Sequence, residues 1–263
     1  MNIRTYGTDE RLGFCREYLY KEKLRSVGEI ILLPIPTSRG GVPSAELLEL
    51  CDELYARYSE GELSGVGETA VVGYGIPKEI RDRLSEVGAL ALDVSLDEEF
   101  VLENARLTAV GALGRLLTEE KSAPSELSIG IIGYGRIGKR LLNYLTLLGA
   151  RPTVFTANAS ARLELGRMGV PTAPYSALER ASELLEIGNF DVIINTAPDM
   201  LIKEGAVTAL ASTKIMELAS GNNFPLGLYV TALPSLPARA YPKSAGKALC
   251  DSVLRMLGER TLK

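Results

Sequence analysis

The feature that most constrains the fold of this chain is a glycine-rich turn between an apolar segment and an amphipathic one. Residues 128–132 suit a buried strand, and residues 141–150 carry apolar side chains at helical spacing. Between them, Gly133, Gly135 and Gly138 fit the pattern G-x-G-x-x-G. In a strand–turn–helix unit these glycines allow a tight turn, a close approach of pyrophosphate to the backbone, and close packing of the helix on the strand. The stretch predicts a dinucleotide-binding domain; the alternative is a glycine-rich turn in another α/β fold.

The start of the following helix and the end of a later strand complete the predicted cofactor site. A helix N-terminus presents free N–H groups and the positive end of its dipole to phosphate. Arg136 lies inside the glycine loop, where its guanidinium suits the pyrophosphate. Residues 191–198 form an apolar strand with a polar end, which we expect to face the nicotinamide half of the cofactor. The residues predicted to bind cofactor in these two segments are Gly133, Tyr134, Gly135, Arg136, Ile137, Gly138, Asn195, Thr196, Ala197 and Pro198.

A third segment bears on the choice between NADP and NAD. NAD-binding domains carry Asp or Glu about 20 residues after the glycine loop, where the carboxylate holds the ribose 2′-hydroxyl. Residues 155–162 contain no acid. Instead, Thr156, Asn158, Ser160 and Arg162 offer hydroxyl, amide and guanidinium groups, which suit a 2′-phosphate. We therefore predict NADP, with NAD as the alternative. In the competing interpretation, Thr156 and Asn158 only cap the turn and Arg162 is a solvated helix charge.

The composition indicates an ordinary globular protein and argues against several classes of partner. Its 263 residues suffice for one large or two medium domains. The formal net charge is −4 without a basic block, which argues against nucleic acid. No apolar run approaches the ~18 residues of a membrane span, and we expect no signal peptide at the N-terminus. Cys15, Cys51 and Cys250 are far apart and suit buried thiols of a cytoplasmic protein, so we expect neither disulfides nor a metal site.

The absence of histidine from the chain restricts its chemistry. It excludes a Ser-His-Asp triad, a His-ligated metal, and the His-assisted hydride transfer of 2-hydroxy acid dehydrogenases. Any proton transfer must therefore use Lys, Asp, Glu, Tyr, Cys or water.

The pattern of strands and helices predicts an α/β fold of two doubly wound parallel-sheet domains joined by a long helix. We expect four parts along the chain. These are residues 1–100, a flavodoxin-like substrate domain; 101–123, a bridging helix and linker; 124–242, a Rossmann NAD(P)-binding domain; and 243–263, a C-terminal helix that packs back across the seam between the domains. The proline-containing segment 233–243 is expected to be a loop.

With its motifs laid out, the chain resembles the family of dipicolinate synthase A subunits. The likeness covers most of the length, and residues 236–246 are its most diagnostic part, because they match the family's Leu-Pro…Pro-Lys-Thr-Ala-Gly motif. One departure is residues 221–225, where the family usually has a Pro-Gly-Gly-x-Asp turn. The other matching stretches are Gly7–Arg11, Ile30–Pro34, Glu103–Ala105 with Thr108, Gly133–Gly138, Asn195–Pro198 and Leu218–Ser220.

The resemblance implies a pyridine-nucleotide oxidoreductase that acts in sporulation on the lysine-biosynthesis branch. Its substrate would be a cyclic dicarboxylate, a dihydro- or hydroxy-tetrahydro-dipicolinate, oxidised to dipicolinate. The family uses NADP and works with a second, flavoprotein-like subunit. We also expect a homo-oligomer, and neither a membrane nor a nucleic acid as partner.

A dicarboxylate substrate requires cationic donors, ideally an Arg or Lys fork. Parallel sheets bind ligands outside the carboxyl ends of their strands. We therefore predict as substrate-binding residues Asp9, Arg11, Thr37, Ser38, Arg39 and Ser220. The candidate catalytic residues are Lys243, Asn104 and Ser244. Lys243 would act as an electrostatic clamp, or as a proton shuttle if burial lowers its pKa; in the alternative it is a solvated first-turn charge.

Two other functions remain open at this point. One is a different NAD(P)-dependent dehydrogenase on the same two-domain frame, which would differ in substrate and not in fold. The other is a non-catalytic nucleotide-binding regulatory subunit, which would bind cofactor without turnover.

Overall fold

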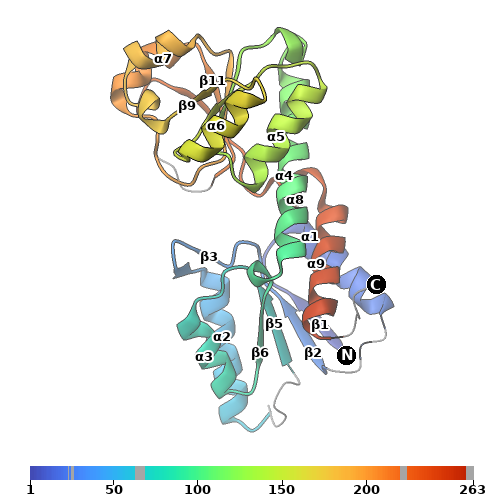
Figure 1. Ribbon diagram of the computed structural model, residues 1–263. Helices are drawn as coiled ribbons and strands as arrows, with labels where there is room; N and C mark the ends of the chain where they lie inside the picture. Colours follow the sequence, from blue (N-terminus) through green and yellow to red (C-terminus); the bar gives the residue numbers. More distant parts are fainter. Residues whose placement is uncertain (23, 25–26, 63–68, 220–223, 259–263) are drawn as a thin grey trace. The chain divides into compact units, whose positions relative to one another are not determined.

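The chain forms two compact α/β units, each built on a parallel sheet (Figure 1). The computed structural model describes residues 1–22, 24, 27–62, 69–219 and 224–258, apart from the side chain of Arg39. The first unit comprises Met1–Asn104 and Pro237–Lys263, and the second comprises Ala105–Leu236. The predicted fold class is thereby confirmed.

The sheet of the first unit has four parallel strands that follow the order of the chain, β1-β2-β5-β6. Its two interior strands, β2 and β5, are buried along their whole length, as expected where helices cover both faces of a sheet. Because β1 lies at the edge, this order differs from the flavodoxin-like order expected for residues 1–100, in which the first strand is internal. The bounds are β1 (Asn2–Thr5), β2 (Glu29–Leu32), β5 (Thr69–Gly73) and β6 (Leu90–Asp93), with a small hairpin of β3 (Ser38–Arg39) and β4 (Val42–Pro43).

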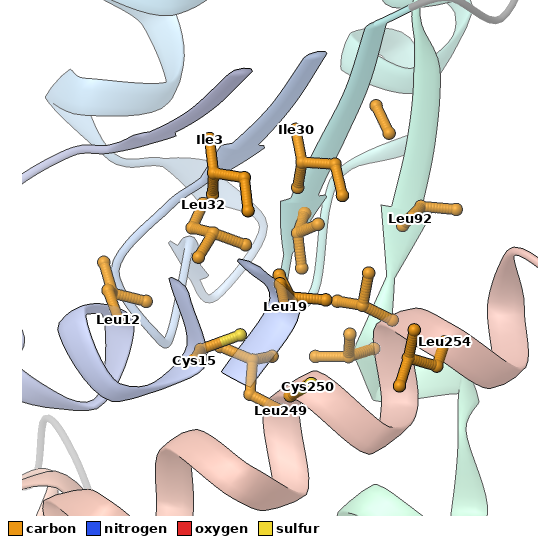
Figure 2. Packing of buried hydrophobic residues seen from close by; sticks show 14 of the residues in the cluster. Ile3, Leu12, Cys15, Leu19, Ile30, Leu32, Leu92, Leu249, Cys250 and Leu254 are labelled. Carbon is orange, nitrogen blue, oxygen red and sulfur yellow. The ribbon is translucent and has the colours of Figure 1, made fainter. Parts of the chain in front are cut away.

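Helices cover both faces of this sheet. Helices α1 (Glu10–Lys21) and α9 (Pro242–Met256) pack against each other and share one hydrophobic cluster with β1 and β2. Figure 2 shows Leu19 and Leu249 of the two helices directed toward Ile30 of the sheet. Helices α2 (Ala45–Ser59) and α3 (Lys78–Glu86) cover the opposite face in a second cluster. Cys15, Cys51 and Cys250 are buried free thiols, as predicted.

The helix α4 (Glu98–Glu119) carries the chain from the first unit into the second. The sheet of the second unit has six parallel strands in the order β12-β11-β10-β7-β8-β9. The order reverses at β7, which gives the Rossmann arrangement and a switch point between β7 and β10. The bounds are β7 (Ile129–Ile132), β8 (Thr153–Phe155), β9 (Thr172–Ala173), β10 (Val192–Asn195), β11 (Lys214–Glu217) and β12 (Tyr229–Ala232).

Both faces of the second sheet are also covered. The second half of α4 packs on one face with α5 (Arg136–Leu147) and α6 (Ala159–Arg167). The other face carries α7 (Ala181–Ile187) and two 3₁₀ helices, Tyr175–Leu178 and Glu204–Leu210. Short 3₁₀ helices also cover Val94–Leu96 and Pro124–Glu126.

The proline-containing segment expected as a loop is largely helical. Helix α8 spans Leu236–Ala240, and α9 begins at Pro242. Proline is tolerated in the first turn of a helix because the N–H group that it lacks has no partner within the helix there. Within the described part of the chain, no helix combines the length and apolarity that crossing a membrane requires.

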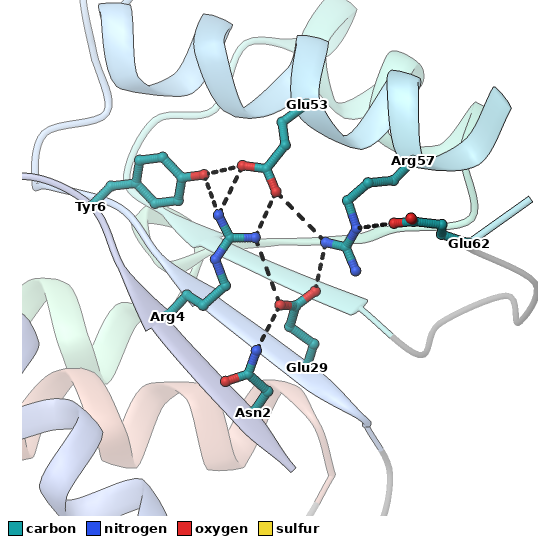
Figure 3. A network of polar contacts seen from close by, with 7 residues as sticks. All are labelled: Asn2, Arg4, Tyr6, Glu29, Glu53, Arg57 and Glu62. Carbon is teal, nitrogen blue, oxygen red and sulfur yellow. Dashed lines mark hydrogen bonds and ion pairs between the residues drawn. The ribbon is translucent and has the colours of Figure 1, made fainter. Parts of the chain in front are cut away.

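A polar network joins β1, β2 and α2 in the first unit (Figure 3). The Arg4 guanidinium donates to both carboxylate oxygens of Glu53 at 2.6 and 2.8 Å, and the Tyr6 hydroxyl donates to the same carboxylate. Arg57 donates to Glu29 at 3.0 Å, and Asn2 donates to Glu29 at 3.1 Å. The hydrogen bond from Arg4 lowers the pKa of Glu53 to about 2, while burial and the Glu53 carboxylate raise the pKa of Tyr6 to about 12.

We predict that Glu53 contributes to stability at neutral pH and loses this contribution in acid. Because its pKa is lowered from 4.5 to about 2 in the folded state, the contribution is complete above about pH 4.5 and fades as the pH falls toward 2. Glu53→Gln should therefore unfold at lower denaturant concentration than the wild type at pH 7, and the difference should shrink between pH 4.5 and 2. Chemical denaturation followed by circular dichroism measures this; a difference that stays constant with pH contradicts it.

The packing of α1 on α9 depends on a glycine. A Cβ atom added to Gly246 would lie 2.6 Å from both the Arg11 carbonyl oxygen and the Phe14 Cβ. Gly13, on α1, has no atom within 4 Å of an added Cβ. Gly246→Ala should therefore destabilise the protein by about 1–3 kcal/mol through overpacking. Gly13→Ala should stabilise it by about 0.5–1 kcal/mol through helix propensity. Urea denaturation of both variants tests the pair, and equal effects would refute this account.

Candidate functional site

The predicted cofactor loop has the geometry of a dinucleotide-binding turn. Gly133 follows β7 with φ +99°, a conformation that favours glycine, and its N–H donates to the Phe155 carbonyl at 2.9 Å. A Cβ on Gly138 would collide with the carbonyl oxygen of Gly133, so only glycine lets α5 lie this close to the strand end. Gly135 has φ −85° and is the N-cap of α5, and an added Cβ there would meet nothing within 4 Å.

This arrangement fits a dinucleotide. The open space beside Gly135 is where pyrophosphate would approach the backbone, and glycine has no side chain with which to cap the helix itself. Arg136 is exposed in the first turn of α5. Tyr134 is half-buried, with the Lys139 ammonium 5.1 Å from its ring centroid, and burial raises its pKa. Ile137 is half-buried and packs against the core beneath the turn.

The turn after β8 is organised by its own polar groups. The Asn158 side chain caps α6 by accepting from the Ala161 N–H at 3.0 Å, and the Asn158 N–H donates to the Thr156 hydroxyl oxygen at 3.3 Å. The Arg162 guanidinium donates to the Thr156 carbonyl at 2.6 Å, and Ser160 is exposed. Thr156 and Asn158 therefore take part in the capping contacts of this turn, and the Arg162 guanidinium lies at the strand end.

The end of β10 lies beside the glycine loop. The Thr196 N–H and hydroxyl both donate to the Ile132 carbonyl, at 2.8 and 2.9 Å. A Cβ on Gly133 would collide with the Thr196 hydroxyl, and it would lie 3.3 Å from the Ala197 nitrogen. Asn195 and Ala197 are buried, whereas Pro198 is exposed. The structure therefore brings the glycine loop and the Asn195–Pro198 turn together at the switch point of the sheet.

The predicted substrate residues of the first unit are engaged in internal contacts. Arg11 is 2% exposed; its Nε lies 2.8 Å from an Asp9 carboxylate oxygen, and it donates to the Ile35 carbonyl at 3.1 Å. Asp9 is the N-cap of α1. The buried Thr37 hydroxyl accepts from the Tyr74 N–H at 2.7 Å, and the Ser38 hydroxyl donates to the Gly75 carbonyl.

The remaining predicted residues are placed as follows. Lys243 and Ser244 are exposed in the first turn of α9, and Asn104 is half-buried on α4. Arg39 belongs to the β3–β4 hairpin, and its side chain is outside the described atoms. Ser220 lies outside the described residues, as do residues 221–223, where the family motif departs.

Sequence reasoning missed two buried carboxylates at strand ends. Asp93, at the end of β6, accepts from the Gly75 and Ile76 N–H groups at 2.8 and 3.0 Å. Glu217, at the end of β11, accepts from Asn195. An acid that ends an apolar run is the signal that could have identified both.

Comparison with known proteins supports the resemblance. No family model matches the chain. It is 27% identical over 139 residues to the dipicolinate synthase A subunit of Bacillus subtilis, a match that spans 50% of this chain and 45% of that protein. The solved structure of that protein has a TM-score of 0.74 at 16% identity, covering 98% of this chain and 96% of the other.

Two further solved structures share the fold. The dipicolinate synthase A subunit of Bacillus halodurans has a TM-score of 0.72 at 18% identity, covering 98% of each chain. A D-isomer specific 2-hydroxyacid dehydrogenase of Lactobacillus delbrueckii, solved in its NAD complexed form, has a TM-score of 0.50 at 14% identity, covering 99% and 98%. The predicted resemblance to the dipicolinate synthase A subunits is confirmed, and the chain shares its fold with all three solved structures.

The different surroundings of Gly135 and Gly138 predict that one substitution affects dinucleotide binding and the other affects stability. Gly135→Ala should leave the melting temperature nearly unchanged, because the new Cβ meets no protein atom within 4 Å and φ −85° suits alanine. The methyl group should nevertheless occupy the approach of the pyrophosphate and weaken dinucleotide binding at least tenfold, measured by calorimetric titration. Gly138→Ala is the contrasting variant, because its collision with Gly133 should lower the melting temperature. Unchanged dinucleotide affinity in Gly135→Ala would contradict the assignment.

Proposed function

We propose that this protein is an NADP-dependent oxidoreductase that forms dipicolinate. Its substrate would be a dihydro-dipicolinate, which loses a hydride and a proton, or a hydroxy-tetrahydro-dipicolinate, which also loses water. The observation that carries the proposal is the three-glycine turn at the switch point of the Rossmann sheet, with its open approach at Gly135. The similarity to the dipicolinate synthase A subunits supports the choice of substrate. By the same similarity, we propose a flavoprotein-like second subunit for the complex and a role in sporulation.

Residues of the second unit would hold the cofactor. The backbone of Gly133–Gly138 and the first turn of α5 would bind the pyrophosphate, with Arg136 beside them. The Asn195–Pro198 turn would contact the nicotinamide half. When bound, the nicotinamide accepts the hydride, and the chain contributes orientation and charge. The absence of histidine is compatible with this reaction, because aromatisation makes the oxidation favourable.

The preference for NADP rests on the turn after β8. Residues 155–162 carry no carboxylate to repel a 2′-phosphate, and the Arg162 guanidinium is held at the strand end by the Thr156 carbonyl. Guanidinium groups bind phosphate with charge-assisted hydrogen bonds.

The proposed substrate contacts divide into direct and supporting residues. Lys243 and Ser244 are exposed at a helix N-terminus, where a cation and free N–H groups favour a carboxylate. Arg39 would supply a second cation. Arg11 and Asp9 would act indirectly. Asp9 pairs with the Arg11 guanidinium, and this guanidinium in turn donates to the Ile35 carbonyl of the adjacent loop.

The burial of Arg11 also favours a second candidate function, that of a non-catalytic nucleotide-binding protein. With Arg11 committed to Asp9 and Ile35, one cation fewer faces a dicarboxylate. Such a protein would bind the cofactor and show no turnover.

We expect calorimetry to give at least tenfold tighter binding of NADP than of NAD. An assay with freshly made dihydrodipicolinate, NADP and a flavoprotein partner should yield ultraviolet-absorbing dipicolinate. Binding without product would support the regulatory alternative, and no binding of either nucleotide would refute both functions.

Titration of Arg162→Ala with NADP and with NAD tests whether Arg162 causes the preference for NADP. Loss of one charge-assisted contact should weaken NADP binding about tenfold, equivalent to about 1.4 kcal/mol, and leave NAD binding unchanged. Arg167→Ala is the matched control, because Arg167 is an exposed cation at the other end of α6. Equal loss for both nucleotides, or an effect of Arg167→Ala, would contradict the role of Arg162.

A further inference from the structure

A buried acid lies at the same sheet edge as the proposed cofactor site. Glu217 is the last residue of β11 and is 5% exposed. It pairs in parallel register with Asn195, the last residue of β10, which is 2% exposed. A carboxylate is costly to bury unless it accepts hydrogen bonds, so the donors that face Glu217 decide what it does at this position.

The Glu217 carboxylate fixes the orientation of a neighbouring amide. Its Oε2 accepts from the Asn195 Nδ2 at 2.6 Å. The same Nδ2 donates to the Ala197 carbonyl at 3.1 Å, and the Asn195 Oδ1 accepts from the Ala197 N–H at 3.2 Å. A carboxylate accepts and does not donate, so it selects the Nδ2 side of the amide and thereby fixes both bonds to Ala197. The Asn195 side chain therefore holds its own turn and is not presented to a ligand.

The turn held in this way shapes the glycine loop. Thr196 lies between Asn195 and Ala197. Its hydroxyl donates to the Ile132 carbonyl and leaves no room for a side chain on Gly133. Its hydroxyl would also lie 3.5 Å from a Cβ on Gly138. A displaced turn would therefore press on the first and third glycines or withdraw from them.

We propose that Glu217 is a positioning residue for the dinucleotide: through the Asn195 amide it sets the Asn195–Pro198 turn against the Gly133–Gly138 loop. The inference rests on the proposed function and adds a residue that does not itself contact the cofactor.

Three substitutions distinguish two possible causes of a change in NADP affinity: the length of the Glu217 side chain, which places its acceptor oxygen near Asn195, and its negative charge. Glu217→Gln keeps an oxygen that can accept from Asn195, so its Kd for NADP should stay within about threefold of wild type. Glu217→Asp keeps the charge but withdraws the acceptor by one methylene, and its Kd should rise at least fivefold. Glu217→Leu removes the acceptor and should raise the Kd at least tenfold. Calorimetric titration with NADP measures all three, and Glu217→Asp serves if Glu217→Leu does not fold.

A control variant at the other end of the same strand identifies a purely structural effect. Thr213, which is 1% exposed, lies just before β11 begins, and its hydroxyl donates to the Phe190 carbonyl at 2.7 Å. Thr213→Val should lower the melting temperature without cofactor and leave the Kd for NADP unchanged. Hydrogen exchange of residues 195–198 should accelerate in Glu217→Asp and Glu217→Leu and not in Thr213→Val.

The outcomes are distinct. If the Kd for NADP is unchanged in Glu217→Asp and Glu217→Leu, the positioning role is overturned. It is also overturned if Glu217→Gln loses affinity for NADP while Glu217→Asp keeps it, because the effect would then come from the charge. If the wild type binds neither NADP nor NAD, the proposed function fails and this inference fails with it.

Discussion

The second unit depends on one close approach, that of α5 to the end of β7. Gly138 lies against the carbonyl of Gly133, and no larger residue fits there. This contact places the start of α5 at the point where the strand order reverses, so that backbone N–H groups, an open face at Gly135 and two neighbouring strand ends meet at one edge. The candidate cofactor site follows from that geometry more than from any single side chain.

The first unit also depends on a close contact, here between distant parts of the chain. Helix α9 returns from the C-terminal end of the sequence to pack on α1, and Gly246 permits the approach. The segment around Lys243 therefore has a packed side and an exposed side. Its glycine and apolar residues secure the helix pair, while Lys243 and Ser244 stay exposed in the first turn.

Buried polar residues at strand ends recur in both units. Asp93 holds the N–H groups of Gly75 and Ile76, and Glu217 holds the Asn195 amide. Each acid accepts hydrogen bonds from donors at the end of the neighbouring strand. A buried donor left without a partner costs about 1–3 kcal/mol. These residues shape the loops at the carboxyl edges, where ligands of parallel sheets bind, without being exposed themselves.

The sequence by itself determined the alternation of strands and helices, the glycine turn and the absence of histidine, because these depend on local periodicity and residue identity. Tertiary structure decided which polar residues face inward. From the sequence, Arg11 and Asn195 are predicted to contact ligands, yet the side chains of both form hydrogen bonds within the protein. The pairing of Asn195 with Glu217 arises from strand register across 22 residues, and the position of α9 arises from packing against the far end of the chain. No local sequence pattern predicts the Asn195–Glu217 pairing or the position of α9, because both depend on how distant segments pack together in the folded chain.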